Sequence, residues 1–316
     1  MRGLAVDAKG LLSIIELDTP EIGPHQALVK TLACGVCSET DAKLIHGTLK
    51  GFVTYPALLG HEAVGEVVKI GYKVKRFRVG DVVLLPCLEE ENSGCHPGWG
   101  GYAEYTVAGD YTAMPRHADI PETYYAQQVL PFEADPVKAV MIVTFREVLS
   151  AIRRFGLKAG EPAAVFGTGP EGLCFIRFCE LLGLGPVVSA DDGDDIIKRF
   201  PDGVENIICA SGVNEDINTA MDIVKCGGKI CVYGCSADPS MVLDWSRAPH
   251  NWQLLFNQRP SKTGEAAAHE QVMSWIKSGA VYIDDFIGDI VPFEDIISVF
   301  DEVLYGKAKK KTVIRY

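Results

Sequence analysis

Three side chains in the first fifth of the chain have the types that bind zinc. Cys37 offers a thiolate, His61 an imidazole and Glu62 a carboxylate, and all three are known zinc ligands. Cys37 follows one expected strand and His61 begins another, so adjacent strand ends could bring them together. Three protein ligands plus water make a catalytic zinc site. The alternative is that Cys37 is a buried thiol and His61 a core histidine.

A glycine-rich segment in the second half of the chain predicts dinucleotide binding. Gly167, Gly169 and Gly172 have the spacing G-x-G-x-x-G, and they lie between an apolar strand and an amphipathic helix. Gly167 permits a tight turn, Gly169 lets the backbone approach a pyrophosphate, and Gly172 packs helix against strand. Pro170 and Glu171 complete the predicted cofactor-binding loop at the helix start, where free N–H groups would hold the phosphates. The alternative is a glycine turn that binds no nucleotide.

An acidic residue follows the next expected strand. Asp191 lies 191 − 172 = 19 positions after Gly172, at the end of the strand expected over 187–191. A carboxylate there accepts hydrogen bonds from the adenosine ribose and repels a 2′-phosphate. The sequence therefore favours NAD over NADP.

The elements around these residues predict two domains and an α/β fold class. Residues 1–135 have β-branched strand patterns punctuated by glycine and proline, typical of a β-barrel or sandwich. Residues 136–284 alternate strands with helices, which indicates a parallel sheet with helical crossovers. Residues 285–316 add a helix and a terminal strand that we expect to return to the first domain.

Several segments in order along the chain resemble one enzyme family. They are CGVCSETD, YPALLGHEAVGEVVKIG, FRVGDVVLLP, GGYAEY and GTGPEGL. Together they are similar to the zinc-dependent medium-chain alcohol dehydrogenases. The resemblance implies a GroES-like β-barrel domain that carries zinc and a Rossmann domain, a doubly wound parallel sheet, that carries NAD(P). It also implies that Cys37, His61 and Glu62 hold the catalytic zinc and that a hydroxyl at Thr40 relays the substrate proton.

The segment after the ligand cysteine departs from the family pattern. The family has C-x-T-D or C-x-S-D, whereas this chain has one extra residue in CSETD. Thr40 is the preferred relay hydroxyl and Ser38 is the rival. His46 is a candidate for passing the proton onward to solvent.

The cysteines predict one zinc ion. Many relatives bind a structural zinc with four cysteines, but residues 86–100 offer only Cys87 and Cys95, which cannot complete a four-ligand site. Cys34 is then expected to be a buried thiol. A glutamate that ligates zinc in some relatives aligns with Val143, which leaves the fourth position to water or to Glu147.

The predicted Rossmann domain is short. Only 206 − 191 = 15 positions separate the end of its second strand from the next convincing strand, whereas a βαβ unit needs about 30 residues. We therefore expect that edge strand three and its helix are missing from the usual order 3-2-1-4-5-6. The loss would expose strand two as an edge and weaken NAD binding near the adenosine.

The expected function is zinc-dependent transfer of a hydride from a secondary alcohol to NAD. The segment HGTLKGFVTYP is similar to polyol, sugar and aminocyclitol dehydrogenases of the family, including those of antibiotic biosynthesis that act on 2-deoxy-scyllo-inosamine. The partners expected are a polyhydroxy small molecule and a second copy of the chain, forming a homodimer through the last Rossmann strand. The alternative is a degenerate relative that acts as a non-redox zinc protein or scaffold.

Composition excludes several other classes of protein. The 316 residues are 47% apolar and carry a net charge of 30 − 42 = −12, which argues against disorder and against nucleic-acid or anionic-membrane surfaces. The short basic group formed by Lys307 and residues 309–311 is interpreted as a solvated end. No apolar run is long enough to span a membrane, and Asp7 and Lys9 interrupt any signal peptide. We expect a cytoplasmic protein whose ten cysteines are thiols or metal ligands.

Overall fold

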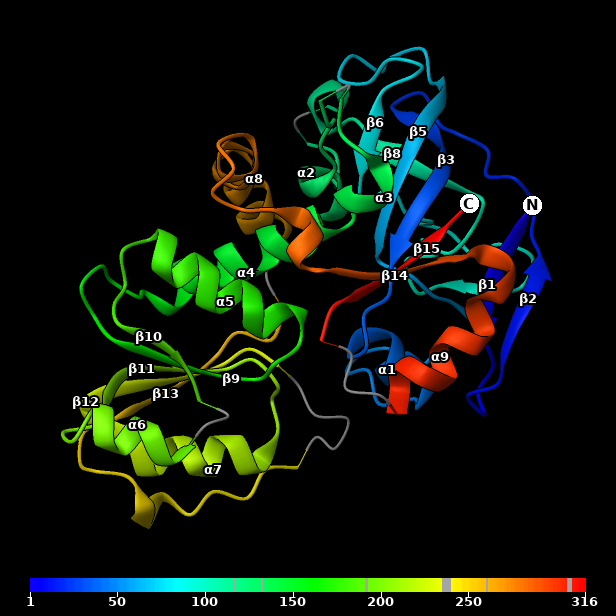
Figure 1. Cartoon of the computed structure of the whole chain (residues 1–316). Coiled ribbons are helices and arrows are strands. Elements are labelled where there is room, and N and C mark those ends of the chain that lie inside the picture. The colour runs from blue at the N-terminus through cyan, green and yellow to red at the C-terminus, as the bar shows by residue number, and fades with distance from the viewer. Residues whose placement is uncertain (116, 132, 191–192, 235–239, 260, 306–308) are drawn as a thin grey trace. The chain divides into compact units, whose positions relative to one another are not determined.

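The computed structural model describes residues 1–316 except 116, 132, 191–192, 235–239, 260 and 306–308. The chain forms two compact units (Figure 1). Unit 1 comprises residues 1–144 and 283–316, and unit 2 comprises residues 145–282. The predicted domain boundaries were 135/136 and 284/285. The first division between the units falls inside a helix, α4 (Met141–Phe155), where the sequence carries no loop signal.

Unit 1 is built from two sheets. One sheet has the strand order β14-β15-β3-β5-β6 with β8 also paired to β3, and the other has the order β2-β1-β4-β7. The strands are β1 (Arg2–Val6), β2 (Leu12–Glu16), β3 (Gln26–Gly35), β4 (Ala57–Leu58), β5 (Glu62–Ile70), β6 (Val82–Leu84), β7 (His96–Pro97), β8 (Tyr105–Gly109), β14 (Ile287–Pro292) and β15 (Lys311–Arg315). Because β15 pairs antiparallel with β3, the chain's last segment adds a strand to the sheet of unit 1.

Short helices complete unit 1. They are α1 (Thr40–Ile45), α2 (Thr123–Ala126), α3 (Pro136–Ala139) and α9 (Ile296–Tyr305). The apolar core next to the predicted zinc ligands joins residues from distant parts of the chain, among them Leu4, Leu44, Leu59, Tyr102 and Phe300. Burying such side chains contributes about 25 cal/mol per Å² of apolar surface. The C-terminal helix is therefore part of the scaffold that supports the site.

Unit 2 contains a five-stranded parallel sheet with the order β10-β9-β11-β12-β13. The strands are β9 (Ala163–Phe166), β10 (Val187–Ser189), β11 (Val204–Cys209), β12 (Val224–Val232) and β13 (Gln253–Phe256), and the helices after α4 are α5 (Pro170–Leu181), α6 (Gly193–Arg199), α7 (Asn214–Ile223) and α8 (Lys262–Lys277). Within this unit α5 lies on one face of the sheet, and α6 and α7 lie on the other (Figure 1). This is a doubly wound sheet.

The shortened sheet is confirmed for the part of the chain that the structure describes. There β10 is an edge strand, and the short helix α6 carries the chain back across β9 to β11. In Rossmann terms the described strands have the order 2-1-4-5-6, so strand three and its helix are missing from the part of the chain that the structure describes. Strand β9, which lies between β10 and β11, is buried along its whole length, whereas β10 is only half-buried.

A group of charged side chains is buried where α4 packs against α8. Arg146 and Glu265 are fully buried and form an ion pair at 3.7 Å. Lys262 donates to the same glutamate at 2.6 Å and lies 3.7 Å from Glu147. Because a buried charge without a partner is costly, this network disfavours any other register of the two helices.

His269 on α8 is expected to set part of the acid sensitivity of folding. Burial and the nearby charge of Arg146 lower its pKa to about 4. Between pH 6.5 and 4 the unfolded chain therefore binds a proton that the folded chain does not. As the pH decreases through this range, the free energy of unfolding decreases by roughly 2–3 kcal/mol. H269Q should flatten this loss in urea melts at pH 4–7. H250Q, at an exposed histidine, should keep the parent slope, and identical slopes for H269Q and the parent would contradict the assignment.

No helix among the described residues is both long enough and apolar enough to cross a membrane.

Candidate active site

The end of β3 and the start of β5 bring the three predicted zinc ligands together. These strands pair antiparallel with Gly35 opposite Glu62, so Cys37, two residues further on, reaches the same edge as His61. One ligand atom from each of Cys37, His61 and Glu62 lies within 4.8 Å of the others. A Cβ at Gly35 would overlap Glu62 Oε2, so a larger residue there would displace the Glu62 carboxylate.

This donor set fits zinc. A thiolate, an imidazole and a carboxylate are zinc ligands, and three of them leave the open position of a catalytic site. In the described part of the chain, no other group of three His, Cys, Asp or Glu side chains meets the same distance criterion. The structure therefore brings together all three residues that the sequence singled out.

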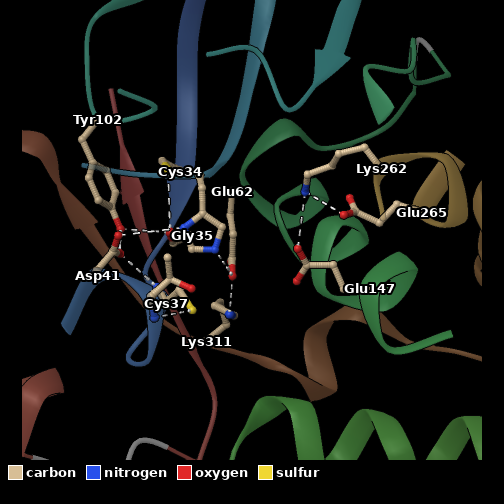
Figure 2. Close-up of polar contacts among 12 residues, drawn as sticks. Cys34, Gly35, Cys37, Asp41, Glu62, Tyr102, Glu147, Lys262, Glu265 and Lys311 are labelled. Carbon is tan, nitrogen blue, oxygen red and sulfur yellow. Dashed lines mark hydrogen bonds and ion pairs between the residues drawn. The ribbon is translucent and has the colours of Figure 1, made fainter. Parts of the chain in front are cut away.

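Asp41 supports the histidine of this group. Its Oδ1 lies 3.9 Å from His61 Nδ1, and its Oδ2 accepts hydrogen bonds from the Tyr102 hydroxyl at 2.8 Å and the Cys37 amide at 3.2 Å (Figure 2). Burial raises the pKa of Asp41 to about 7, against the effect of these two hydrogen bonds. A carboxylate beside a ligating imidazole orients the ring and sets its tautomer. The sequence predicted no role for Asp41, although the aspartate that ends CSETD places a carboxylate close to Cys37.

Lys311 is the second residue that sequence reasoning missed, and its interpretation as part of a solvated end is wrong. Its side chain is 2% exposed, and its Nζ donates to Glu62 Oε1 at 2.9 Å (Figure 2). The pairing of β15 with β3 places Val313 opposite Gly35, so the first residue of β15 arrives beside Glu62. A lysine in a basic run enters the core here because a buried carboxylate receives it.

The predicted proton-relay residues differ in burial. Thr40 is the first residue of α1 and is half-buried, and its amide donates to Cys37 Sγ at 3.4 Å. Ser38 is exposed, and so is His46, the residue that caps the C-terminus of α1. The extra residue in CSETD is absorbed by the turn that begins α1, which keeps Thr40 beside the thiolate.

Several cysteines outside the zinc-ligand group lie buried among apolar side chains, whereas Cys226 is exposed. Cys34 is fully buried, as predicted, and burial raises the pKa of its thiol well above the usual value. Cys95 packs in a core cluster with Leu58 and Leu88, and Cys87 is 5% exposed. The segment 86–100 is thus held by apolar contacts and by hydrogen bonds such as Cys95 N to Asn92 O at 2.9 Å.

Glu147, the alternative fourth ligand, has another partner. It belongs to unit 2, where its carboxylate lies 3.7 Å from Lys262 Nζ (Figure 2). Val143, at the position that is glutamate in some relatives, is fully buried.

The glycine loop has the geometry that its spacing predicted. Gly167 has φ +110°, and a Cβ at Gly172 would overlap the Gly167 carbonyl oxygen. Gly169 caps the N-terminus of α5, whose first turn holds Pro170 and Glu171. The first-turn N–H groups and the helix dipole favour an anion at this end. Asp191, the predicted ribose ligand, lies outside the described residues.

Known proteins match this chain in sequence and in fold. Residues 23–119 match the alcohol dehydrogenase GroES-like domain. The NADP-dependent isopropanol dehydrogenase of Entamoeba histolytica is 31% identical over 266 residues, covering 73% of this chain and 72% of that protein. D-xylulose reductase A of Aspergillus niger is 25% identical over 338 residues, covering 93% and 91% respectively. The crystal structure of 2R,3R-butanediol dehydrogenase from Bacillus subtilis superposes with a TM-score of 0.78 at 21% identity, over 100% of this chain and 99% of that one.

These matches agree with the β domain, the parallel sheet and the clustered donor set described above. The matched segment contains all three predicted zinc ligands. The chain therefore belongs to the zinc-dependent medium-chain alcohol dehydrogenases, and it is an oxidoreductase of the alcohol dehydrogenase type.

Proposed function

We propose that the protein oxidises a secondary hydroxyl group of a polyol, sugar or aminocyclitol and transfers the hydride to NAD. The observation that carries the proposal is the Cys37–His61–Glu62 group, whose ligand atoms lie within 4.8 Å of one another. The glycine loop that begins α5 supports it, because such a loop holds the diphosphate of a nicotinamide cofactor.

In this proposal the chain's own residues position the reactants and move the proton. Zinc, when bound, supplies Lewis acidity that lowers the pKa of the substrate hydroxyl, and NAD accepts the hydride. Cys37, His61 and Glu62 hold the metal, while Asp41 orients His61. The Thr40 hydroxyl takes the substrate proton and passes it toward His46 or solvent. The protein's contribution is alignment of the reacting groups.

Lys311 has a supporting role in the proposal. Its ammonium group binds one oxygen of Glu62 and thereby fixes the orientation of a carboxylate that would otherwise rotate. A buried charge is tolerated only with a partner of this kind. The pair therefore holds Glu62 in place for ligation.

We propose NAD as the cofactor and one catalytic zinc per chain. The segment that follows β10 contains Asp191, Asp192, Asp194 and Asp195, and this negative charge opposes the 2′-phosphate of NADP. One relative is named NADP-dependent, so we expect this chain to differ from that relative in the segment that follows β10. Cys87 and Cys95 are too few for a structural zinc, and the shortened sheet is expected to make NAD binding weak.

Polyols are the proposed substrate class because two of the similar proteins are named for a xylulose and a butanediol. The test is elemental analysis together with a titration of NADH fluorescence. We expect one zinc per chain, saturable NADH binding that NADPH does not match, and oxidation of vicinal diols. Two zinc ions would contradict the single-site proposal. No binding at millimolar NADH would overturn the redox function and favour a non-redox zinc protein or scaffold.

A further inference from the structure

Trp99 has a backbone conformation that tryptophan rarely adopts. Its φ is +73°, in the left-handed region. Glycine and asparagine enter that region readily, whereas a bulky side chain there is an outlier that the surrounding structure must enforce. Such outliers cluster at functional sites, which makes Trp99 a candidate functional residue.

Close packing of the backbone enforces this conformation. The segment around Trp99 runs against the chain just before His61, where Gly101 N donates to Gly60 O at 2.7 Å. The carbonyl of Trp99 is held in turn by the Leu88 amide at 2.7 Å. A Cβ on Gly101 would lie 2.7 Å from Gly60 O, so only glycine permits this approach. These contacts hold the segment of Trp99 beside Gly60, the residue that precedes the predicted metal ligand His61.

The indole lies against the imidazole of His61. The two ring centroids are 5.4 Å apart and the rings are inclined at 49°. Trp99 packs against the apolar core of unit 1 and is only half-buried. Trp99 therefore keeps some accessible surface, and it lies beside one of the predicted metal ligands.

We propose that Trp99 determines specificity for alcohols built on a six-membered ring, by stacking on one face of that ring. This inference rests on the proposed function and names the substrate class of the same site. The face of an aromatic ring carries negative charge and attracts polarised C–H bonds. A cyclohexane-type ring presents several such bonds on one flat face without any bond rotation, whereas a linear alcohol loses rotational freedom to match it.

The proposal separates Trp99 from a purely structural role. A residue that only oriented His61 would act through the metal, and its removal would affect all alcohols alike. A stacking residue affects the ring-containing alcohols and leaves linear ones unchanged. Comparison of two diols of similar polarity therefore distinguishes these roles.

The experiment uses the zinc-loaded full chain with trans-cyclohexane-1,2-diol and butane-2,3-diol. Binding is measured by calorimetry without nicotinamide, so that no turnover occurs, and KM and kcat are then measured with NAD. We expect the parent protein to bind the cyclic diol more tightly, and W99A to weaken that binding about tenfold while changing the linear diol less than about twofold. W99F should retain most of the preference. W245A, at a tryptophan that is 76% exposed in unit 2, should match the parent.

Each of the other outcomes overturns either the role of Trp99 or the proposed function. Equal losses for both diols in W99A, loss of zinc from W99A, or a parent that prefers the linear diol or binds neither would overturn the role of Trp99. A parent that binds the cyclic diol in a Trp99-dependent way but reduces no NAD would overturn the proposed function and leave the stacking role intact. Oxidation of both diols, with an unchanged preference in W99A, would overturn the stacking role and leave the proposed function intact.

Discussion

C37S is expected to abolish zinc binding and to lower kcat/KM for alcohol oxidation by about 1000-fold. Cys37 supplies the only thiolate in the ligand group of the described residues, and a serine hydroxyl does not ionise readily enough to replace it. Loss of the Lewis acid removes roughly 4 kcal/mol of transition-state stabilisation, which corresponds to that rate factor. Elemental analysis and steady-state kinetics measure the two effects.

The fold should survive this change, because Cys37 lies two residues beyond the end of β3 and is only half-buried. With metal removed by a chelator from both proteins, we expect the free energies of unfolding to agree within about 1 kcal/mol. C34S is the matched control, since Cys34 lies three residues away, fully buried, and should keep one zinc. A collapsed C37S protein, or zinc loss in C34S but not C37S, would refute the assignment.

Among the substitutions that add one methyl group to a glycine of the loop, G172A is expected to weaken cofactor binding most. The added Cβ would overlap the Gly167 carbonyl oxygen, a backbone atom that cannot rotate away, so the loop must move. Overpacking of this kind costs about 1–3 kcal/mol of stability. We expect the NADH dissociation constant to rise at least about tenfold, as measured by fluorescence titration.

The control for this prediction lies one residue further along the same helix. Leu173 is 36% exposed, so L173A should leave NADH affinity within about twofold of the parent. Zinc content should be unchanged in both variants, because the ligand group belongs to unit 1. Normal NADH affinity in G172A would show that the loop does not hold the cofactor.

The shortened sheet is expected to affect how tightly the cofactor binds. In the described residues β10 is an edge strand, and an uncovered edge leaves backbone N–H and C=O groups unpaired. In the full strand order, a further strand and helix flank the segment that follows strand two. Weaker NAD binding than in full-length relatives is the consequence we infer, and the NADH titration measures it.

Local sequence patterns predicted the cofactor loop, the shortened sheet and the candidate zinc ligands. The G-x-G-x-x-G spacing placed the loop between β9 and α5, and the 15-residue interval after Asp191 predicted the missing edge strand. Cys37, His61 and Glu62 were identified as zinc ligands by their types and by the strands beside them. The loop and the shortened sheet are confirmed because residue spacing along one strand or loop is set by the backbone itself, whereas zinc ligation by the three side chains stays a prediction.

Only the tertiary structure decided which distant residues complete the site. Lys311 lies 249 positions from Glu62, and its burial depends on strand pairing between the two ends of the chain. Asp41 and Trp99 acquire their roles from contacts with His61 that lie outside any helical or strand periodicity. Local patterns carry no information on such contacts, because their energies arise from charges and rings that meet only after the sheets have formed.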